Sequence, residues 1–256
     1  MSDLDILTKI PDVKYREPAP EIDASEFQKV IESRRSVRVY TDEPVPEDVM
    51  RKCIDNALLA PNSSNLQCWE FYWVRDKEKK KELAKICMGQ SAASTAQELV
   101  VCVARMDKWK EIQKQMITSF DAQGDVPKGA YTYYQKIVPL AYNQGPLGLF
   151  GLLKKLVFFF QGLTKVTPRE PTSYNDMRVW AHKTTALGCE NLMLSLRAYG
   201  YDSCPMEGHD SKRVKKLLNL PKKAEICMVV SAGKRAENGI FSPQVRMPKK
   251  QFVFEV

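Results

Sequence analysis

Histidine is scarce in this sequence, and the motifs of several enzyme classes are missing. The two histidines, His182 and His209, are too few for a histidine-rich metal site. The chain has no P-loop and no GxGxxG, GxSxG or HExxH pattern. It shows no acid–base dyad and no nucleophile beside its base, and His182, within an expected helix, is interpreted as structural. An enzyme without reactive groups of its own would leave the chemistry to a bound cofactor.

Paired cysteines and long apolar runs are also missing. The seven cysteines form no CxxC pair, so neither a zinc site nor a thioredoxin-like motif is indicated. Most lie in apolar runs, which is typical of buried, reduced thiols, and a cytoplasmic location is expected. No signal peptide is expected. The apolar segment 147–160 is interrupted by Lys154 and Lys155 and is shorter than the roughly 20 residues of a membrane-spanning helix.

Positive charge is abundant instead. The 256 residues have a formal net charge of +8, with basic runs at 77–81 and 212–216. These runs predict solvated helix faces, because they are not interleaved with aromatic residues and belong to no nucleic-acid-binding module. We expect no nucleic-acid partner and no membrane contact. A basic surface would suit an anionic cofactor or a dinucleotide phosphate.

Helices and strands alternate along the chain, which predicts an α+β or α/β class. Residues 1–24 are expected to form an extended arm, and residues 25–256 one domain. Helices are expected from Asp23 or Ser25 to about Ser33, from Pro46 to before Pro61, at 76–88, through 109–117, at 173–199 and at 210–218. Strands are expected at 37–40, 71–74, 99–104 and 226–231, with a loop at 204–208 and a possible edge strand at 251–256.

Four segments are candidates for ligand binding. Three guanidiniums and a hydroxyl in the run 34–38 could hold an anion, because arginine binds phosphate in bidentate fashion. The polar loop 62–68 leads into an expected strand, and the turn 205–208 could present backbone N–H groups. Arg246 precedes the C-terminal tail. Taken alone, the four segments are equally or more typical of, respectively, a solvated basic cluster, a capping loop, a helix-to-helix turn and a surface arginine.

The order and spacing of these segments resemble the nitroreductase family. An Arg-x-Ser motif ends the first helix, and a Pro-Ser-Ser-x-Asn-x-Gln-Pro-Trp-like loop ends the second before a strand. The corresponding residues here are 34–38, 61–69 and 70–74. A Pro-x-Glu-Gly-Phe-Asp-like turn and a closing Arg-x-Pro follow the long helix, at 205–210 and 246–248. The resemblance covers roughly residues 25–105 and 175–256.

This resemblance implies an α+β fold with a central, mostly antiparallel sheet flanked by helices, in an intertwined homodimer. It implies an FMN-dependent enzyme that passes electrons from NAD(P)H to a small electron-poor acceptor such as a nitroaromatic, quinone or flavin. The FMN contacts that it implies are Arg34, Arg35, Ser36 and Arg246 around the phosphate and ribityl chain, Arg38 and Gln90 at the pyrimidine, Pro205, Met206, Glu207 and Gly208 near N5, and Asn62, Ser63 and Asn65 from the other subunit.

The sequence departs from the family pattern in three places. Cys68 stands where a proline is usual, Gln244 stands where some relatives have a lysine near the phosphate, and the insertion 106–172 is longer than the family minimum. The acceptor is therefore open. A specialised relative (a reductive dehalogenase, a flavin-destroying enzyme or an enoate-type reductase) and a non-catalytic FMN-binding module are alternatives. Segment 147–160 could be a lid over the flavin, a core helix of the insertion or a membrane-surface helix.

Overall fold

The computed structural model describes residues 15–124 and 126–256. Its one sheet has four strands in the order β1-β2-β4-β3, and all three pairings are antiparallel. The α+β class with a mostly antiparallel sheet is thus confirmed. The strands are β1 (Trp69–Trp73), β2 (Glu98–Ala104), β3 (Asp202–Met206) and β4 (Glu225–Gly233).

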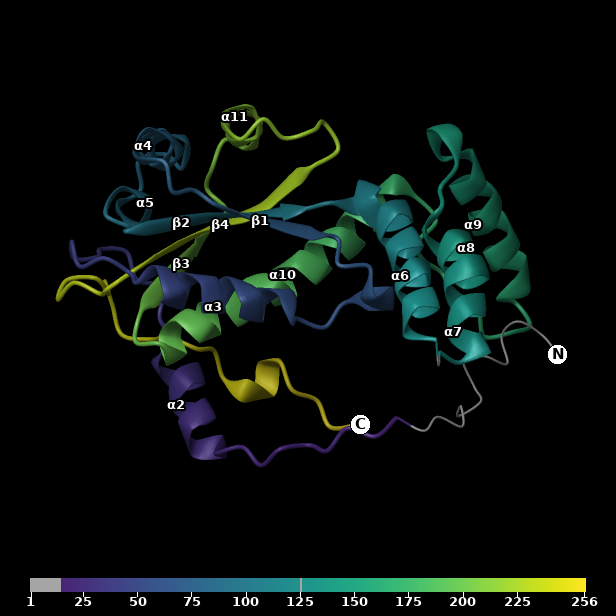
Figure 1. Cartoon of the computed structure of the whole chain (residues 1–256), viewed down its shortest axis with the longest axis horizontal. Coiled ribbons are helices and arrows are strands. Elements are labelled where there is room, and N and C mark those ends of the chain that lie inside the picture. Colours follow the sequence, from purple (N-terminus) through teal and green to yellow (C-terminus); the bar gives the residue numbers. More distant parts are fainter. Residues whose placement is uncertain (1–14, 125) are drawn as a thin grey trace.

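Helices cover both faces of this sheet, as Figure 1 shows. These helices fall into three groups. One group lies on one face of the sheet, a second lies on the other face, and a third forms the insertion beside the sheet. The first comprises α4 (Lys77–Ile86), α5 (Ser91–Ser94) and α11 (Ser211–Leu217). The second comprises α3 (Glu47–Leu58) and α10 (Tyr174–Ala198). The third comprises η2 (Met106–Lys108), α6 (Trp109–Gln123), α7 (Lys128–Thr132), η3 (Tyr133–Ile137), α8 (Val138–Tyr142), η4 (Pro146–Gly148) and α9 (Leu149–Gln161).

The apolar run of β2 explains this layering. Successive side chains of a strand point to opposite faces, so Val101 packs with α4, α5 and α11 while Val100 and Cys102 pack with α3 and α10. Gly188 lets α10 approach the sheet, because a Cβ there would lie 2.8 Å from Cζ of Phe71. A strand buried on both faces therefore appears in the sequence as a continuous apolar run.

Helix caps set where several helices begin. The carboxylate of Asp23 accepts from two backbone N–H groups at the start of α2 (Ala24–Ser33), as does that of Asp210 for α11. Asp76 and Ser173 each accept one N–H at the starts of α4 and α10. Since side-chain oxygens at this position satisfy orphan N–H groups, the helices expected at these places are confirmed.

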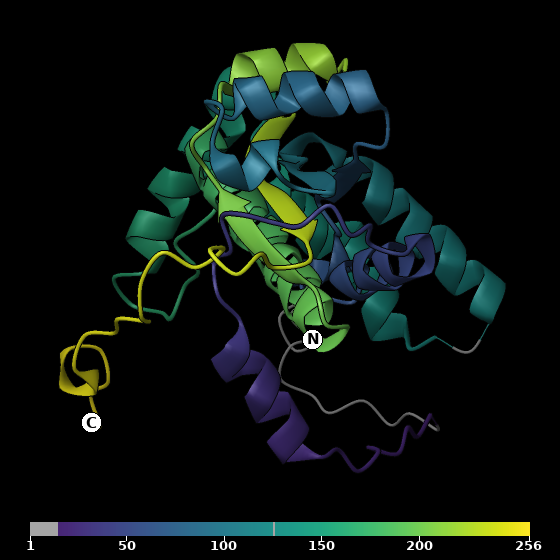
Figure 2. The ribbon, with the colours of Figure 1, turned by 90° about the vertical axis from the view of Figure 1, so that its left-hand side faces the viewer.

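Three expectations for short segments were wrong. Residues 37–40 form no strand: Ser36 and Tyr40 make only isolated bridges, to Ser203 and Arg235. The expected loop at 204–208 is largely strand β3, which includes Pro205 and Met206. The C-terminal tail contains a single turn, η5 (Lys249–Gln251), and no strand, because none of the strands described here lies beside it. Figure 2 shows that this tail extends away from the body of the molecule.

Segment 147–160 is helical, as η4 and α9, but it is not a core helix of the insertion. Only Gly151 and Lys154 of α9 are buried, while most of its leucine and phenylalanine side chains are exposed. The insertion's own core is built instead around Trp109, Tyr134 and Tyr142. No helix among the described residues is long and apolar enough to cross a membrane.

Candidate functional site: an arginine-lined cavity beside strand β3

The run 34–38 follows α2 and is held against the edge of the sheet. The N–H of Val37 donates to the carbonyl of Ser203 in β3 at 3.1 Å, and the N–H of Arg38 donates to the carbonyl of Gly239 at 2.8 Å. Val37 is fully buried, whereas Ser36 and Arg38 on either side of it are not. Because neighbouring side chains of an extended run point to opposite sides, burying Val37 turns Ser36 and Arg38 outward.

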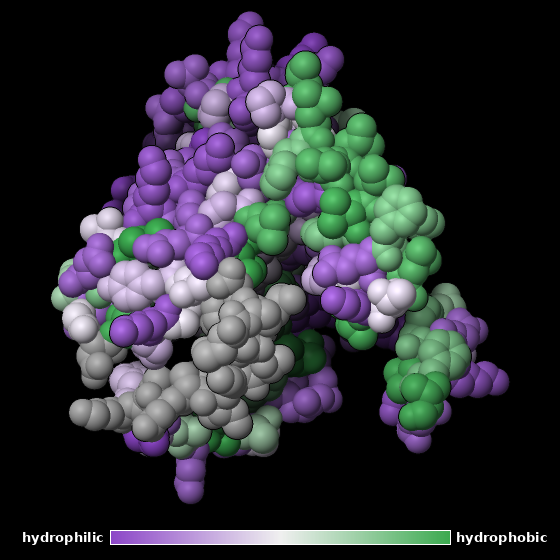
Figure 3. Space-filling view, turned by 90° about the vertical axis from the view of Figure 1, so that its right-hand side faces the viewer, coloured by the Kyte–Doolittle hydropathy of each residue, from purple (hydrophilic) through white to green (hydrophobic). Residues whose placement is uncertain are grey.

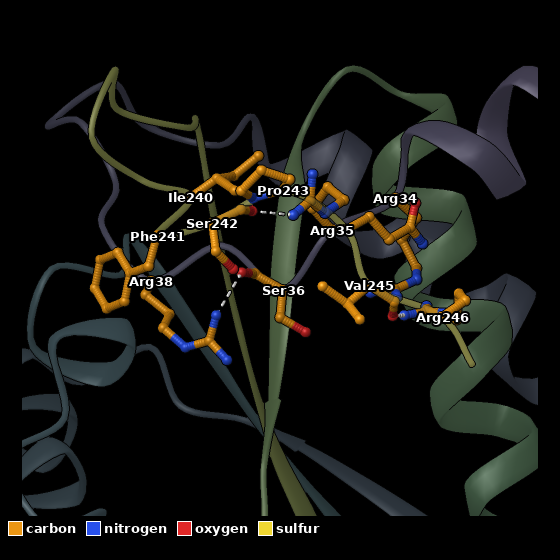
Figure 4. A pocket seen from close by; sticks show the side chains of 11 residues that line it. Arg34, Arg35, Ser36, Arg38, Ile240, Phe241, Ser242, Pro243, Val245 and Arg246 are labelled. Atoms are coloured by element: carbon orange, nitrogen blue, oxygen red, sulfur yellow. Dashed lines mark hydrogen bonds between the residues drawn. The ribbon is translucent and has the colours of Figure 1, made fainter.

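A cavity of about 160 Å³ lies between this run and the segment 240–246. Figure 4 shows the arginine side chains converging on it from both segments. Arg35 donates to the carbonyl of Ser242 at 2.5 Å, and Arg38 donates to the carbonyl of Ser36 at 3.2 Å. The lining residues are Arg34, Arg35, Ser36, Arg38, Ile240, Phe241, Ser242, Pro243, Gln244, Val245 and Arg246. The structure thus brings together five residues that the sequence assigned to the phosphate and pyrimidine side of one ligand.

The cavity concentrates positive charge without counter-charge. Its lining contains four arginines and no aspartate or glutamate. None of these arginines forms an ion pair with a carboxylate among the described residues; Arg246, for example, donates only to the carbonyl of Val245. Guanidiniums gathered in this way repel one another unless an anion lies between them. The cavity is therefore chemically suited to a phosphate group.

The segment 240–243 is the part of this cavity that sequence reasoning missed. Phe241 packs against the guanidinium of Arg38, whose Cζ atom lies 5.6 Å from the centroid of the phenyl ring. The signal available in the sequence was weak: a Gly239-Ile240-Phe241-Ser242-Pro243 run without helical or strand periodicity. Such a run is typical of a loop, and only the fold brings it to the arginines.

The turn after β3 presents free backbone donors. Within the described residues, the N–H groups of Glu207 and Gly208 donate to no acceptor, and both residues are exposed. The Gln90 amide nitrogen donates to the carbonyl of Gly208 at 2.9 Å and to that of Cys87 at 3.0 Å. Gln90 therefore fixes the turn to the start of α5. Two exposed N–H groups at a fixed turn can donate to a polar ring edge.

The loop 62–67 is rigid and closely bonded within itself. Its Asn62 side chain accepts from the N–H of Gln67 at 2.8 Å, and the amide of Gln67 donates to the Asn65 side chain at 3.3 Å. Ser64, Asn65 and Gln67 all have positive φ, a conformation that side chains rarely adopt. Strained backbone of this kind persists only where the surroundings enforce it and is common at ligand sites.

This loop does not meet the arginine-lined cavity within one chain. It leads into Trp69, whose partner Ala104 pairs with Glu225 at one end of β4. Ser36 bridges to Ser203, which pairs with Ala232 near the other end. The two sites are separated by seven residues of β4, about 23 Å at roughly 3.3 Å per residue. Asn62, Ser63 and Asn65 thus cannot complete the cavity of their own chain.

Other charged clusters have structural roles. Arg105 donates to Glu70 at 2.6 Å and to Asp107 at 3.0 Å. Against the opposing effect of burial, Lys108 and Arg105 lower the pKa of Glu70, and Arg105 lowers the pKa of Asp107. Burial raises the pKa of the Cys53, Cys68 and Cys87 thiols, which disfavours reactive thiolates. No group of three or more metal-binding side chains occurs within residues 15–124 and 126–256.

Comparison with known proteins decides the family. The family model described as "Nitroreductase family" matches residues 31–234, which include the arginine run, the 62–67 loop and the Glu207–Gly208 turn. The chain belongs to the nitroreductase family. The nitroreductase resemblance drawn from the sequence motifs is thereby confirmed.

Individual nitroreductase-like proteins support this placement. A Thermus thermophilus protein named NADH dehydrogenase is 28% identical over 237 residues, which is 86% of this chain and 91% of that protein. An Exiguobacterium sibiricum structure in complex with FMN has a TM-score of 0.68 and 22% identity, covering 94% of this chain and 99% of its own. The NADPH:FMN oxidoreductase of Vibrio harveyi, complexed with NAD⁺, has a TM-score of 0.60 and 18% identity over 90% and 76%. The two structures show that the fold is shared.

Proposed function

We propose that this member of the nitroreductase family is an FMN-dependent oxidoreductase that transfers electrons from NAD(P)H to a small electron-poor acceptor. The observation that carries the proposal is the cavity of four arginines without a carboxylate, at the edge of the strand β3 that leads into a turn with free N–H donors. A ligand with a terminal phosphate and a polar heterocycle fits this donor set. When bound, FMN would supply the redox chemistry that links the nicotinamide to the acceptor.

The cavity residues would hold FMN by its phosphate and ribityl chain. Arg34 and Arg246 come from the two segments that line the cavity, and Ser36 adds a hydroxyl to the same lining. Arg35 donates to the Ser242 carbonyl, so we propose that it supports the 240–246 side of the cavity and also contributes positive charge. Charge-assisted hydrogen bonds of this kind contribute about 1.5–3 kcal/mol each.

Arg38 and the turn would act on the ring. The cation of Arg38, stacked on Phe241, would stabilise negative charge near the pyrimidine of the reduced ring. The free N–H groups of Glu207 and Gly208 would donate to the N5 side of the ring. Pro205 and Met206 form the end of β3 that leads into this turn. Gln90, whose amide nitrogen is already bonded to the carbonyl of Gly208, would hold this turn and face the pyrimidine edge.

The second half of the site would come from a partner subunit. The loop with Asn62, Ser63 and Asn65 lies at the far end of the sheet from its own arginines, so a second copy must supply it. We therefore infer a homodimer with two shared sites. The insertion lies beside this loop and would cover the same partner flavin. Tyr134 donates to the Ser64 carbonyl at 2.7 Å. This contact supports the proposal that the insertion's aromatic core borders the entrance for acceptors.

Turnover assays test this function. The purified chain, loaded with FMN, is assayed for NADH and NADPH oxidation with a nitroaromatic, a quinone or free flavin as acceptor. We expect turnover with at least one nicotinamide and one acceptor, and its loss when FMN is removed. A protein that binds FMN but shows no turnover with either nicotinamide would instead be a flavin-binding module.

A further inference from the structure

Helix α9 presents a wide apolar surface to the solvent. Leu152 is 66% exposed and Phe160 61%, although side chains of this kind are normally buried. Figure 3 shows hydrophobic side chains gathered into a continuous stripe on this face of the molecule. The exposed apolar residues of α9 and the turn after it are Leu149, Leu152, Leu153, Leu156, Val157, Phe159, Phe160 and Leu163. A continuous apolar stripe of this kind marks an interaction site.

The orientation of this stripe is fixed by the buried side of α9. The Lys154 ammonium donates to the carbonyls of Ala141 at 2.7 Å and Pro171 at 3.0 Å, which anchors the middle of the helix. Gly151 packs so closely on the Thr172 carbonyl that a side chain would collide with it. Arg169 donates to the Phe158 carbonyl at 2.8 Å near the end of the helix. The polar contacts of α9 thus face the protein, and its apolar side faces outward.

Basic residues predominate around α9, although Glu170 and Asp176 line a pocket with Lys155 on the side of the helix that faces residues 169–176. From Val126 to Arg169 the sequence contains six lysines and arginines and no aspartate or glutamate. Lys155 and Lys165 are exposed beside the apolar stripe. A basic segment with leucine and phenylalanine is complementary to a surface that is apolar inside and negatively charged outside, which is the composition of an anionic phospholipid bilayer.

A second copy of the chain fits this face less well. Two α9 helices in a symmetric contact would bring their exposed Lys155 side chains toward one another, because α9 itself contains no carboxylate. The loop that we assign to the dimer is contacted by η3 and α8, through Tyr133 and Tyr142, and not by α9. Formation of the flavin site therefore gives no reason for a partner subunit to cover the outer side of α9.

We propose that the exposed side of α9 docks the protein on the surface of an anionic phospholipid bilayer. The helix has 13 residues, about 20 Å at roughly 1.5 Å per residue, so it is too short to cross the hydrocarbon core. It would lie in the plane of the interface with Leu152, Leu156 and Phe159 inserted, while Lys155 and Lys165 contact lipid phosphates. The exposed apolar side of α9 thus favours the membrane-surface helix among the alternatives for segment 147–160, although the sequence as a whole predicts no membrane contact.

Vesicle cosedimentation tests this proposal on the full chain. We expect binding to phosphatidylcholine vesicles that contain phosphatidylglycerol and little binding to phosphatidylcholine alone. Lys155→Glu/Lys165→Glu should weaken binding by about 25-fold or more, since each cation near an anionic surface contributes roughly fivefold. Lys77→Glu/Lys79→Glu on α4 changes the net charge equally and should weaken binding much less, because these charges lie away from the docking face.

The apolar part is tested by Leu152→Gln/Leu156→Gln/Phe159→Gln, with circular dichroism as the control for folding. All three side chains are more than half exposed, so the fold should persist while vesicle binding is lost. Three results would overturn the proposal: no binding of the wild type to phosphatidylglycerol vesicles, equal weakening by both lysine pairs, or unchanged binding of the triple variant. A large assembly of the wild type that the triple variant disperses, seen by light scattering, would show instead that a second copy covers α9.

Discussion

The hydroxyl of Tyr142 lies 2.9 Å from the hydroxyl of Ser64 and thereby joins the insertion to the loop 62–67. A second hydroxyl of the insertion, that of Tyr133, lies 2.7 Å from the same serine. The insertion therefore holds the strained loop that we expect to reach the flavin of the partner subunit. If the loop reaches the partner flavin as proposed, this small cluster of hydroxyl groups would link flavin binding to the insertion.

Replacing Tyr142 should show how much this cluster contributes. Tyr142→Phe removes hydrogen bonds to Ser63 and Ser64 from a side chain that is only 6% exposed. At about 0.5–1.5 kcal/mol for each of the two bonds, we expect the free energy of unfolding in urea to fall by about 1–3 kcal/mol. Tyr131→Phe, which loses one bond to Asp121 on an exposed part of the insertion, should cost less than about 0.5 kcal/mol. Equal losses for the two variants would contradict the structural role of Tyr142.

Removing Arg34 should weaken flavin binding without unfolding the chain. Arg34 lines the cavity and forms no ion pair with any described residue, so Arg34→Ala would relieve repulsion in the free protein but remove the proposed contact to phosphate. We expect the dissociation constant for FMN to rise about 10- to 150-fold, measured by quenching of flavin fluorescence. Arg213→Ala, at a surface ion pair with Asp210, is the matched control and should leave it unchanged. An unchanged dissociation constant for FMN in Arg34→Ala would show that the cavity is not part of the FMN site.

The two histidines should titrate on opposite sides of their usual value. The Cys227 side chain and, less strongly, the Glu225 carboxylate raise the pKa of His182 against the effect of burial, whereas burial lowers the pKa of His209. With only two histidines in the sequence, their ring resonances in an NMR titration can be assigned with His182→Gln. We expect one midpoint above about 6.5 and the other below it. The reverse assignment would contradict the contacts described for these residues.

The raised pKa of His182 also sets a direction for stability. A group that binds its proton more tightly when folded stabilises the protein fully below the unfolded pKa of about 6.5. That contribution is lost as the pH rises through the higher, folded pKa. The stability advantage of the wild type over His182→Gln in urea unfolding should therefore be larger at pH 6 than at pH 8. An advantage that grows with pH would contradict this.

The shared-site account requires a dimer. One chain has a mass of 29.2 kDa, so light scattering of the FMN-bound protein should give twice that value. The large exposed side chains of the C-terminal tail, Phe252 and Phe254, are expected to be buried in this interface. Truncation before Phe252 should thus shift the dimer toward monomer. A monomer with FMN fully bound would show that the loop 62–67 is not needed from a second copy.

Much of the fold could be predicted because local chemistry agrees with it. The apolar side chains of the run 99–104 point to both faces of the strand, so all of them are buried when helices cover both faces of the sheet. Asp23, Asp76 and Asp210 mark helix starts, because their carboxylates accept hydrogen bonds from backbone N–H groups of the first turn. The candidate site could be predicted as four segments whose order matched a family. What brings the 240–243 loop to the arginines is tertiary packing, which no local pattern encodes.

The errors have a common physical cause. The sequence predicts a loop at 204–208 rather than a strand, because Pro205 disfavours strands, and Asp202 just before this segment does so too. Asp202 is compensated by Arg197 and Arg235, and Pro205 is tolerated because β3 lies at the edge of the sheet. The tail 251–256 alternates like a strand but has no strand to pair with among the described residues. Edge position and the presence of a partner strand are properties of the whole fold.

The most direct measurement of the central claim is an anaerobic titration of the purified protein with NADH and then NADPH, followed by flavin absorbance. We predict that the protein retains FMN with absorbance near that of oxidised flavin and that at least one nicotinamide bleaches it stoichiometrically. Readmission of an electron-poor acceptor should then restore the oxidised spectrum. A colourless protein that does not bind added FMN, or bound FMN that neither nicotinamide reduces, would contradict the account.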